Sequence, residues 1–517
     1  MDHPHPAGPA RRRLAILAAV CLAALALPLS FSGGAVATPA IGRDLGGSAV
    51  ALRWITNAFM LTFGSLLMAA GTLADRYGRK RLFALGTAGF ALSSLALGLA
   101  PSLWAVDLLR AAQGVAAAAA LAGGTAALAQ EFDGPARTRA FSLLGTTFGI
   151  GLAFGPVLAG WLIHTVGWRA IFLSSAAAGA LALAVGVPRL RESRDPHAGG
   201  LDRAGTATFT GALSCFTFGL IQAPESGWSS PLVIGLLGAA ALLAAAFVAV
   251  ERRAPRPMLD LSLFRYARFV GVQVLPIATC YGYIVLLVLL PLRLIGVEGF
   301  DEIDAGWMML ALSGPMLVVP LAAAALTRWL APGILCGLGL LLAAAGLWWL
   351  SLALRAGAGP AALAPLLLIG LGTALPWGLM DGLSVSVVPK ERAGMATGIF
   401  STTRVAGEGI ALAVVSAVLA ALTQQRLLAG MPTADAGRTA YDAAQAAAQL
   451  AAGDFAHAAA WLPSVAGATL RQGYADAFGL LLHGLAVVTA LCAIAVFVFL
   501  SGRERSAPDA AGAATAP

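Results

Sequence analysis

The stretch Gly71-Thr72-Leu73-Ala74-Asp75-Arg76-Tyr77-Gly78-Arg79-Lys80-Arg81-Leu82-Phe83 lies between two long apolar runs, and it decides the fold. Five charged residues fall between Asp75 and Arg81, and four of them are Lys or Arg. Basic residues collect in the cytoplasmic loops that join transmembrane helices. Two glycines, at 71 and 78, would let two helix ends approach and the backbone turn sharply. The stretch therefore predicts a short cytoplasmic loop between two membrane spans.

The composition predicts a membrane protein built from helices. The chain has 517 residues, of which 59% are hydrophobic and 11% charged, against about 25% charged residues in a soluble domain. A transmembrane β-barrel would need alternating segments of about ten residues. The apolar runs here are about twenty residues long, as a spanning helix requires, and are rich in Ala and Leu. The fold class expected is an all-α polytopic membrane protein.

The apolar runs predict fourteen spans, at residues 14–31, 50–70, 82–100, 104–127, 141–163, 168–187, 205–222, 231–250, 269–291, 305–326, 333–354, 361–387, 396–422 and 475–500. With the N-terminus inside, 23 of the 33 Lys and Arg residues fall on the cytoplasmic side. This bias predicts that both termini are cytoplasmic. The expected location is the inner (plasma) membrane, with several passes through the lipid bilayer.

The order of residues around the charged stretch carries more information than its charge. The pattern Gly-x-Leu-Ala-Asp-Arg-x-Gly-Arg-Lys, at 71–80, resembles the loop after the second span of major facilitator superfamily transporters. An extra pair of spans and the segment Pro257-Met258-Leu259-Asp260-Leu261-Ser262-Leu263-Phe264 resemble the fourteen-span drug:proton antiporter subfamily. The resemblance implies a conformational latch formed by Gly71, Asp75, Arg76, Gly78 and Arg79.

The resemblance also implies the domain organisation. Residues 1–187 would form an N-terminal half with spans 1–6, and 188–268 a linker with two extra spans. Residues 269–500 would form a C-terminal half with spans 9–14, followed by a cytoplasmic tail at 501–517. An Ala-rich outer loop at 423–474 is expected to form a solvated helical lid without a ligand role, with Thr433 and Asp435 as possible helix caps.

The fifth span contains glycines at four-residue spacing, which allow close helix packing. Its residues Gly151, Gly155, Pro156 and Gly160 resemble the antiporter motif of the family, and Gly155-Pro156 permits a kink. Ala159 stands where the family usually has Gly. This motif favours export over import.

The fourth span contains Arg110 in the sequence Leu-Arg-Ala-Ala-Gln-Gly, with Asp107 three residues earlier on the same helical face. A buried Arg costs about 2.5–3.5 kcal/mol on insertion scales, so it should have a partner. In the family that this chain resembles, the Arg of this motif is linked to proton coupling. Two interpretations stay open: a role in coupling, and a structural Asp107–Arg110 pair.

The first span departs from the family, because Ser30 occupies the position of the usual acidic residue. A hydroxyl cannot exchange a proton near neutral pH, so coupling would need another carboxyl. Glu408 is a candidate, since Arg404 lies four residues earlier on the same face. Burial and a nearby arginine shift the pKa of such a carboxyl in opposite directions. Asp381 is the second candidate, and a purely structural ion pair is the alternative for each.

The expected function is a secondary active transporter, a proton-coupled antiporter that exports small amphipathic compounds or drugs by alternating access. Export of one endogenous metabolite and uncoupled facilitated transport are alternatives that the sequence does not separate. The protein is not expected to be an enzyme, to bind a cofactor, metal or nucleic acid, or to oligomerise. Its partners would be a small-molecule substrate, protons and the bilayer. A substrate cavity is expected to be lined by Ser30, Trp54, Gln113, Trp377 and Phe400.

Overall fold

The computed structural model describes residues 9–132, 134–194, 202–254, 257, 259, 261–354, 359–387, 393–429 and 436–500. These residues are almost all helical and contain no strand. Thirteen helices are long and apolar enough to cross a membrane, and a bent pair makes a fourteenth. The all-α class and the predicted number of spans are therefore confirmed.

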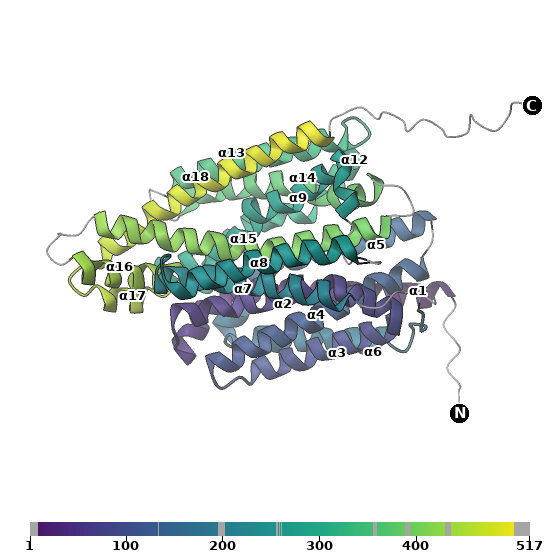
Figure 1. Cartoon of the computed structure of the whole chain (residues 1–517), viewed down its shortest axis with the longest axis horizontal. Helices are drawn as coiled ribbons and strands as arrows, with labels where there is room; N and C mark the ends of the chain where they lie inside the picture. Colours follow the sequence, from purple (N-terminus) through teal and green to yellow (C-terminus); the bar gives the residue numbers. More distant parts are fainter. Residues whose placement is uncertain are drawn as a thin grey trace, which may run out of the picture.

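The first six helices are α1 (Pro9–Leu45), α2 (Ala49–Tyr77), α3 (Arg79–Gly98), α4 (Leu103–Glu131), α5 (Gly134–Thr165) and α6 (Arg169–Gly186). Helices α1, α2, α3, α4 and α6 lie in the lower part of the bundle, and α5 lies higher, beside α15 (Figure 1). The side chains of Ser48 and Ser102 accept hydrogen bonds from backbone N–H groups at the start of α2 and α4. Such caps satisfy donors that a helix start leaves open, and they fix where these two spans begin.

The next two helices, α7 (Arg203–Ser226) and α8 (Pro231–Arg253), pack against each other. Helix α7 also packs against α2 and α15, whereas α8 is mostly exposed along its length. The pair therefore covers the side of the bundle where the first and second groups of six spans meet (Figure 1).

The second group begins with a long span of four consecutive segments: α9 (Ala267–Thr279), η2 (Cys280–Ile284), α10 (Val285–Pro291) and η3 (Leu292–Val297). Both η segments are π-helical, a geometry frequent at functional sites. The next span comprises α11 (Glu302–Ser313), η4 (Gly314–Leu317) and α12 (Val319–Leu326). The remaining spans are α13 (Pro332–Ala353), α14 (Leu363–Ser386), α15 (Ala393–Ala429) and α18 (Gly467–Leu500).

The segment between α15 and α18 differs from the expected solvated lid. It contains α16 (Ala436–Ala451) and α17 (Phe455–Trp461). One face of α16 is fully buried, with Ala443, Ala446 and Ala447 at 0% exposure. Small alanine side chains let this face pack closely against α15 and α7. The proposed caps Thr433 and Asp435 lie outside the described residues.

The charged stretch is not a loop of thirteen residues, because α2 continues to Tyr77 and α3 begins at Arg79. The turn is made by Gly78 alone, which has φ +119°, a conformation that side chains disfavour. Gly71 lies within α2, with open space around its missing side chain, so it makes no close approach.

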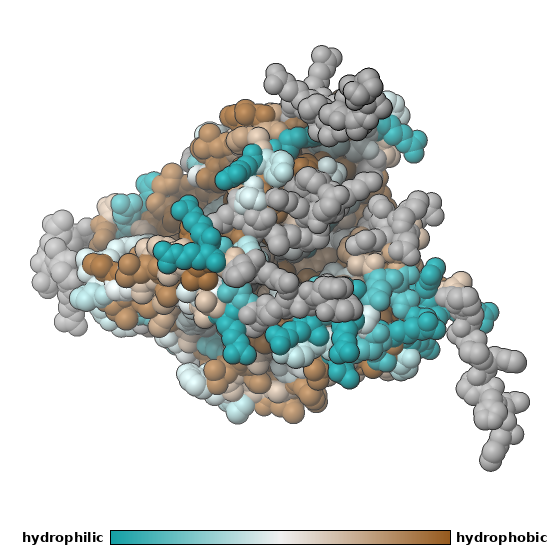
Figure 2. All heavy atoms as spheres, turned by 45° about the vertical axis from the view of Figure 1, so that its right-hand side comes forward, coloured by the Kyte–Doolittle hydropathy of each residue, from teal (hydrophilic) through white to brown (hydrophobic). Residues whose placement is uncertain are grey.

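We call the end of the bundle that holds Gly78, the start of α1 and the end of α18 the basic end. Hydrophilic side chains gather there (Figure 2), opposite α16 and α17.

Candidate transport site

Arg404 of α15 occupies a box of aromatic rings between three helices. Its guanidinium carbon lies 5.5 Å from the ring centre of Phe148 in α5, 5.8 Å from that of Phe400 in α15, and 5.9 Å from that of Trp377 in α14. Its Nη1 donates to the two carboxylate oxygens of Asp381 at 3.3 and 3.5 Å. Aromatic faces attract a cation electrostatically. The arrangement joins helices from both groups of spans around one charge.

Glu408 lies one turn further along α15 and is 4% exposed. The expected Arg404–Glu408 pair is not formed, because the guanidinium turns to Asp381 instead. Within the described residues, no donor forms a hydrogen bond with Glu408 Oε1. A charged carboxylate without partners is costly inside a membrane. Glu408 is therefore an acidic group whose charge no nearby bond stabilises in this conformation.

The two carboxyl groups near Arg404 differ in their access to water. The side chain of Asp381 is 50% exposed, whereas that of Arg404 is 11% exposed. Glu408 is enclosed more completely still. Arg404 therefore has a carboxyl in contact with solvent on one side and a buried one on the other.

Arg110 is fully buried in the first group of spans. Its Nε donates to the carbonyl of Ile55 at 2.7 Å, and its Nη1 donates to Ser30 Oγ at 3.1 Å and to Gln113 Oε1 at 2.5 Å. The ring of Phe59 lies 4.4 Å from the guanidinium carbon. All these partners are uncharged. Ser30, which replaces the family acid, thus still meets Arg110, but it brings no charge.

The expected Asp107–Arg110 ion pair is absent from the part of α4 that the structure describes. One buried oxygen of Asp107 has no hydrogen bond there. Gln113 instead continues the network inward by donating to Ser94 Oγ at 2.7 Å. Gln113 is therefore part of the packing between α3 and α4 in this conformation.

The glycines of the predicted antiporter motif lie at close helix contacts. A Cβ at Gly151 would lie 2.5 Å from Pro28 Cγ, and one at Gly155 would lie 1.9 Å from Ser32 Oγ, both on α1. A Cβ at Gly160 would lie 2.1 Å from the carbonyl oxygen of Glu302, at the start of α11. The axis of α5 bends by 41° between 143–152 and 154–165. Pro156 cannot bond back to residue 152, which is a physical cause of the bend.

The predicted latch residues hold α2, α3 and the segment after α6 together at the basic end. Arg79 donates to Asp75 Oδ1 through Nε and Nη2, at 3.0 and 2.9 Å. The backbone N–H of Arg79 donates to the carbonyl of Ser193 at 2.9 Å. A Cβ at Gly78 would lie 2.4 Å from Glu192 Oε1. Arg76 stacks on Tyr77, with its guanidinium carbon 5.3 Å from the ring centre.

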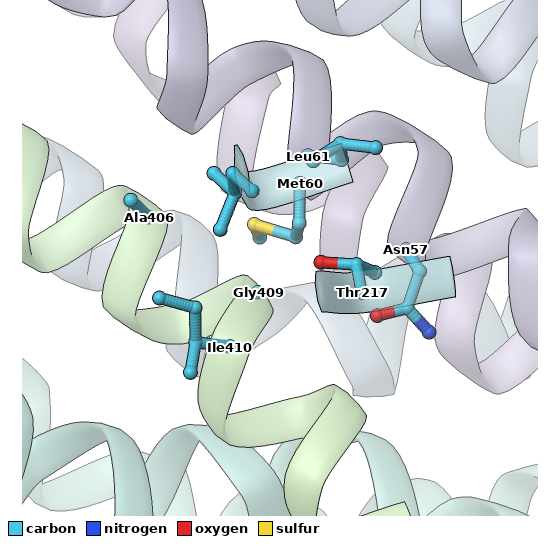
Figure 3. A pocket seen from close by; sticks show the side chains of 8 residues that line it. Asn57, Met60, Leu61, Thr217, Ala406, Gly409 and Ile410 are labelled. Carbon is cyan, nitrogen blue, oxygen red and sulfur yellow. The ribbon is translucent and has the colours of Figure 1, made fainter. Parts of the chain in front are cut away.

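The line of contact between α2 and α15 is very tight. A Cβ at Gly64 would lie 2.8 Å from backbone atoms of Ala406. Helix α7 covers this line, and Figure 3 shows the crevice where the three helices meet. The crevice does not admit a water molecule, and it is lined by Asn57, Met60, Leu61, Leu213, Thr217, Ala406, Gly409 and Ile410.

The five residues assigned to a cavity do not gather at one place. Trp377 and Phe400 lie beside Arg404. Trp54, in contrast, packs edge-on against Phe218 of α7, with ring centres 5.8 Å apart. Ser30 and Gln113 belong to the Arg110 network. The assignment therefore divides into an aromatic site around Arg404 and a separate polar network.

Sequence reasoning missed two residues beside the aromatic site and two others buried in α2. Phe148 contributes the ring from α5. Tyr283, in the π-helical segment η2, has its ring centre 6.5 Å from that of Trp377. Arg53 and Asn57 are buried in α2. A charged residue and an amide four positions apart in an apolar run were a usable signal for the last two, because intramembrane polar residues mark functional paths.

Comparison with known proteins adds independent information. A model of the Major Facilitator Superfamily matches residues 19–412. The tetracenomycin C resistance and export protein of Streptomyces glaucescens is 33% identical, over 78% of this chain and 75% of the relative. The multidrug resistance protein Stp of Mycobacterium tuberculosis is 33% identical, over 75% and 72%. The cephamycin export protein CmcT of Amycolatopsis lactamdurans is 32% identical, over 74% and 80%.

Solved structures show the same fold at low sequence identity. A bacterial homologue of the human lysosomal transporter Spinster aligns with a TM-score of 0.61 and 16% identity, covering 96% of this chain and 99% of that one. A POT family transporter gives a TM-score of 0.61 and 13% identity, over 93% and 95%. Fold and sequence agree with the resemblance carried by the stretch at 71–83. The chain belongs to the Major Facilitator Superfamily and is a multi-span membrane transporter.

Proposed function

We propose that this transporter is a proton-coupled antiporter that exports small amphipathic compounds, with both termini on the cytoplasmic side of the inner membrane. Its relatives are named for resistance to or export of antibiotics, which supports outward transport. The observation that carries the proposal is the buried carboxyl of Glu408 beside an arginine that is paired with another acid.

The Arg404 region supplies the parts of a proton switch. When Glu408 is protonated, Arg404 keeps its pair with Asp381, as in this structure. When Glu408 loses its proton, its new charge competes with Asp381 for the same guanidinium, because residues four apart on a helix can meet. Arg404 then leaves the aromatic box, and the contacts among α5, α14 and α15 change. The two protonation states would favour different packings of the two groups of spans.

The same region suits an amphipathic substrate. Phe148, Trp377 and Phe400 offer flat apolar surface around a charged group. A substrate that displaces Arg404 from the rings would move this side chain toward Glu408. Substrate and proton would then compete through one arginine, as antiport requires.

An uncoupled facilitator is the second candidate, and a specific observation favours it. Ser30 provides no titratable group beside Arg110, where the resembling family has an acid. If all proton coupling depends on the first group of spans, this chain has lost its coupling to protons. If Glu408 carries coupling, the loss is without consequence.

Inverted membrane vesicles test the proposal directly. An imposed pH gradient, acidic inside, should drive uptake of a fluorescent amphipathic compound such as ethidium or of an antibiotic from a panel. Collapse of the gradient with a protonophore should stop uptake. Uptake that persists at the same initial rate without a gradient would support the facilitator instead.

A further inference from the structure

We propose that a polar chamber beneath α16 is a second substrate site, which receives the oxygen-rich part of an exported compound, and that α16 is its lid. The chamber lies between α1, α2 and α15, and its polar lining residues are Thr38, Arg53, Thr56, Asn57 and Ser416. The inference rests on the topology given under the proposed function, in which both cytoplasmic termini lie at the basic end, so that this end of the bundle is the outer one.

Arg53 holds three parts of the chain together at the chamber. Its Nη1 donates to the carbonyl of Ile221 in α7, and its Nη2 donates to the carbonyl of Ala448 in α16, both at 3.1 Å. The Ala448 carbonyl already accepts the N–H of Ala452. At Ala448, Arg53 therefore adds a second hydrogen bond to a carbonyl that already accepts one. This charge-assisted bond fastens α16 over the chamber.

Asn57 supplies the independent indication of a ligand. Its side chain is 3% exposed and lines the chamber. Its Nδ2 donates to the carbonyl of Arg53 at 2.9 Å, but no described donor reaches its Oδ1. A buried polar atom without a partner is costly. A hydroxyl or a water entering the chamber would satisfy this oxygen.

The chemistry of the lining defines the class of ligand. Among the described residues, the lining combines one permanent cation, an amide and three hydroxyl groups, and it includes no carboxylate. A guanidinium such as that of Arg53 can donate to carbonyl, phenolate and carboxylate oxygens of a ligand. A cationic compound would find no carboxylate among these described lining residues. The chamber should therefore accept a neutral or anionic compound rich in oxygen, such as a hydroxyquinone, in preference to a cation.

The size of the chamber identifies this conformation as closed. Its volume is about 20 Å³, enough for one water molecule, whereas drug-sized ligands occupy roughly 300–1,000 Å³. Ala451 and Ala452, at the end of α16, form part of its wall. Movement of α16 away from Arg53 would enlarge the chamber and open it to the outside. Movement of the lid would therefore also form the site.

Cysteine labelling tests the lid. In a background without the five native cysteines, Ser416→Cys is exposed from outside to a membrane-impermeant maleimide. Ala447→Asp, which places a charge on the buried face of α16, should accelerate labelling about tenfold or more. Ala444→Asp, on a half-buried position of the same helix, is the matched control and should not. Arg53→Met, which removes the bond to the lid at Ala448, is a second opening variant should Ala447→Asp fail to reach the membrane.

Protection from labelling tests the ligand class. In the Ala447→Asp background, external 1,8-dihydroxyanthraquinone should slow labelling of Ser416→Cys at least severalfold, and ethidium should not. Asn57→Leu should abolish that protection. Equal labelling with and without the opening variants, or protection by ethidium alone, would overturn the proposal. Glu408→Gln separates the two hypotheses: loss of pH-driven export with an unchanged labelling pattern would leave the chamber intact.

Discussion

Replacement of Gly160 by alanine tests whether α5 and α11 form a closed gate at the end of the bundle opposite Gly78. A Cβ at this position would lie 2.1 Å from the carbonyl oxygen of Glu302. That oxygen belongs to backbone and cannot rotate away, so the two helices must separate. Gly149→Ala on the same helix is the matched control, because its Cβ would lie 3.9 Å from its nearest neighbours, in ordinary van der Waals contact.

The size of the effect follows from where the clash falls. Overpacking of a tight contact costs about 1–3 kcal/mol. Gly160 and Glu302 come from opposite groups of spans, so the cost applies only while this gate is closed. A cost of about 1–3 kcal/mol shifts the ratio of closed to open molecules by roughly 5–150-fold.

Spin-label distance measurements would report the shift. Leu99, after α3, and Leu352, near the end of α13, are exposed at the same end of the bundle as this gate, at 72% and 49%. Cysteines there, in a background without native cysteines, would carry the labels. Gly160→Ala should convert most molecules to a longer distance, and Gly149→Ala should leave the distribution as in the parent. Matching distributions for both variants would refute the gate assignment.

Three further predictions follow from the basic end, from the first span and from topology. Gly78→Leu should cut transport strongly, because it strains a positive φ at a cost of about 1–3 kcal/mol and its side chain meets Glu192. Gly71→Leu, whose side chain would enter open space, should transport normally. Equal losses of transport in the two variants would contradict the latch. Ser30→Asp restores an acid beside the buried arginine of α4, so export should acquire a second pH-dependent step; an unchanged pH profile would exclude that network from coupling. Ser193→Cys should resist an impermeant thiol reagent applied outside whereas Ala436→Cys reacts, and the reverse pattern would invert the topology.

The fold could be predicted from the sequence because membrane spans have a strong local signature. Twenty-residue apolar runs and the basic loops between them require no knowledge of contacts. The limits of the charged stretch were wrong because charged residues can continue a helix past the membrane surface, and only Gly78 interrupts it. The expectation that the outer loop is solvated was wrong because the alanines of α16 give no apolar run long enough to indicate burial. Their burial depends on partners far away in the chain.

The site could be predicted in its components but not in its pairing. Arg404, Asp381, Trp377 and Phe400 were all identified, and they lie together. Their neighbour on α15, Glu408, was expected to hold the arginine because local spacing suggested it. Spacing along one helix cannot show that a neighbouring helix brings a second carboxyl nearer. The division of the chain into 1–187, 188–268 and 269–500 stays a prediction.

Proton release measured on addition of substrate to the purified transporter, in weakly buffered solution, tests the central claim most directly. The parent protein should release protons when an exported compound binds, because substrate displaces Arg404 toward Glu408 and favours the carboxylate. Glu408→Gln should bind the compound but release no proton, whereas Asp304→Asn, at an exposed acid outside the site, should behave as the parent. Undiminished proton release by Glu408→Gln would contradict the account.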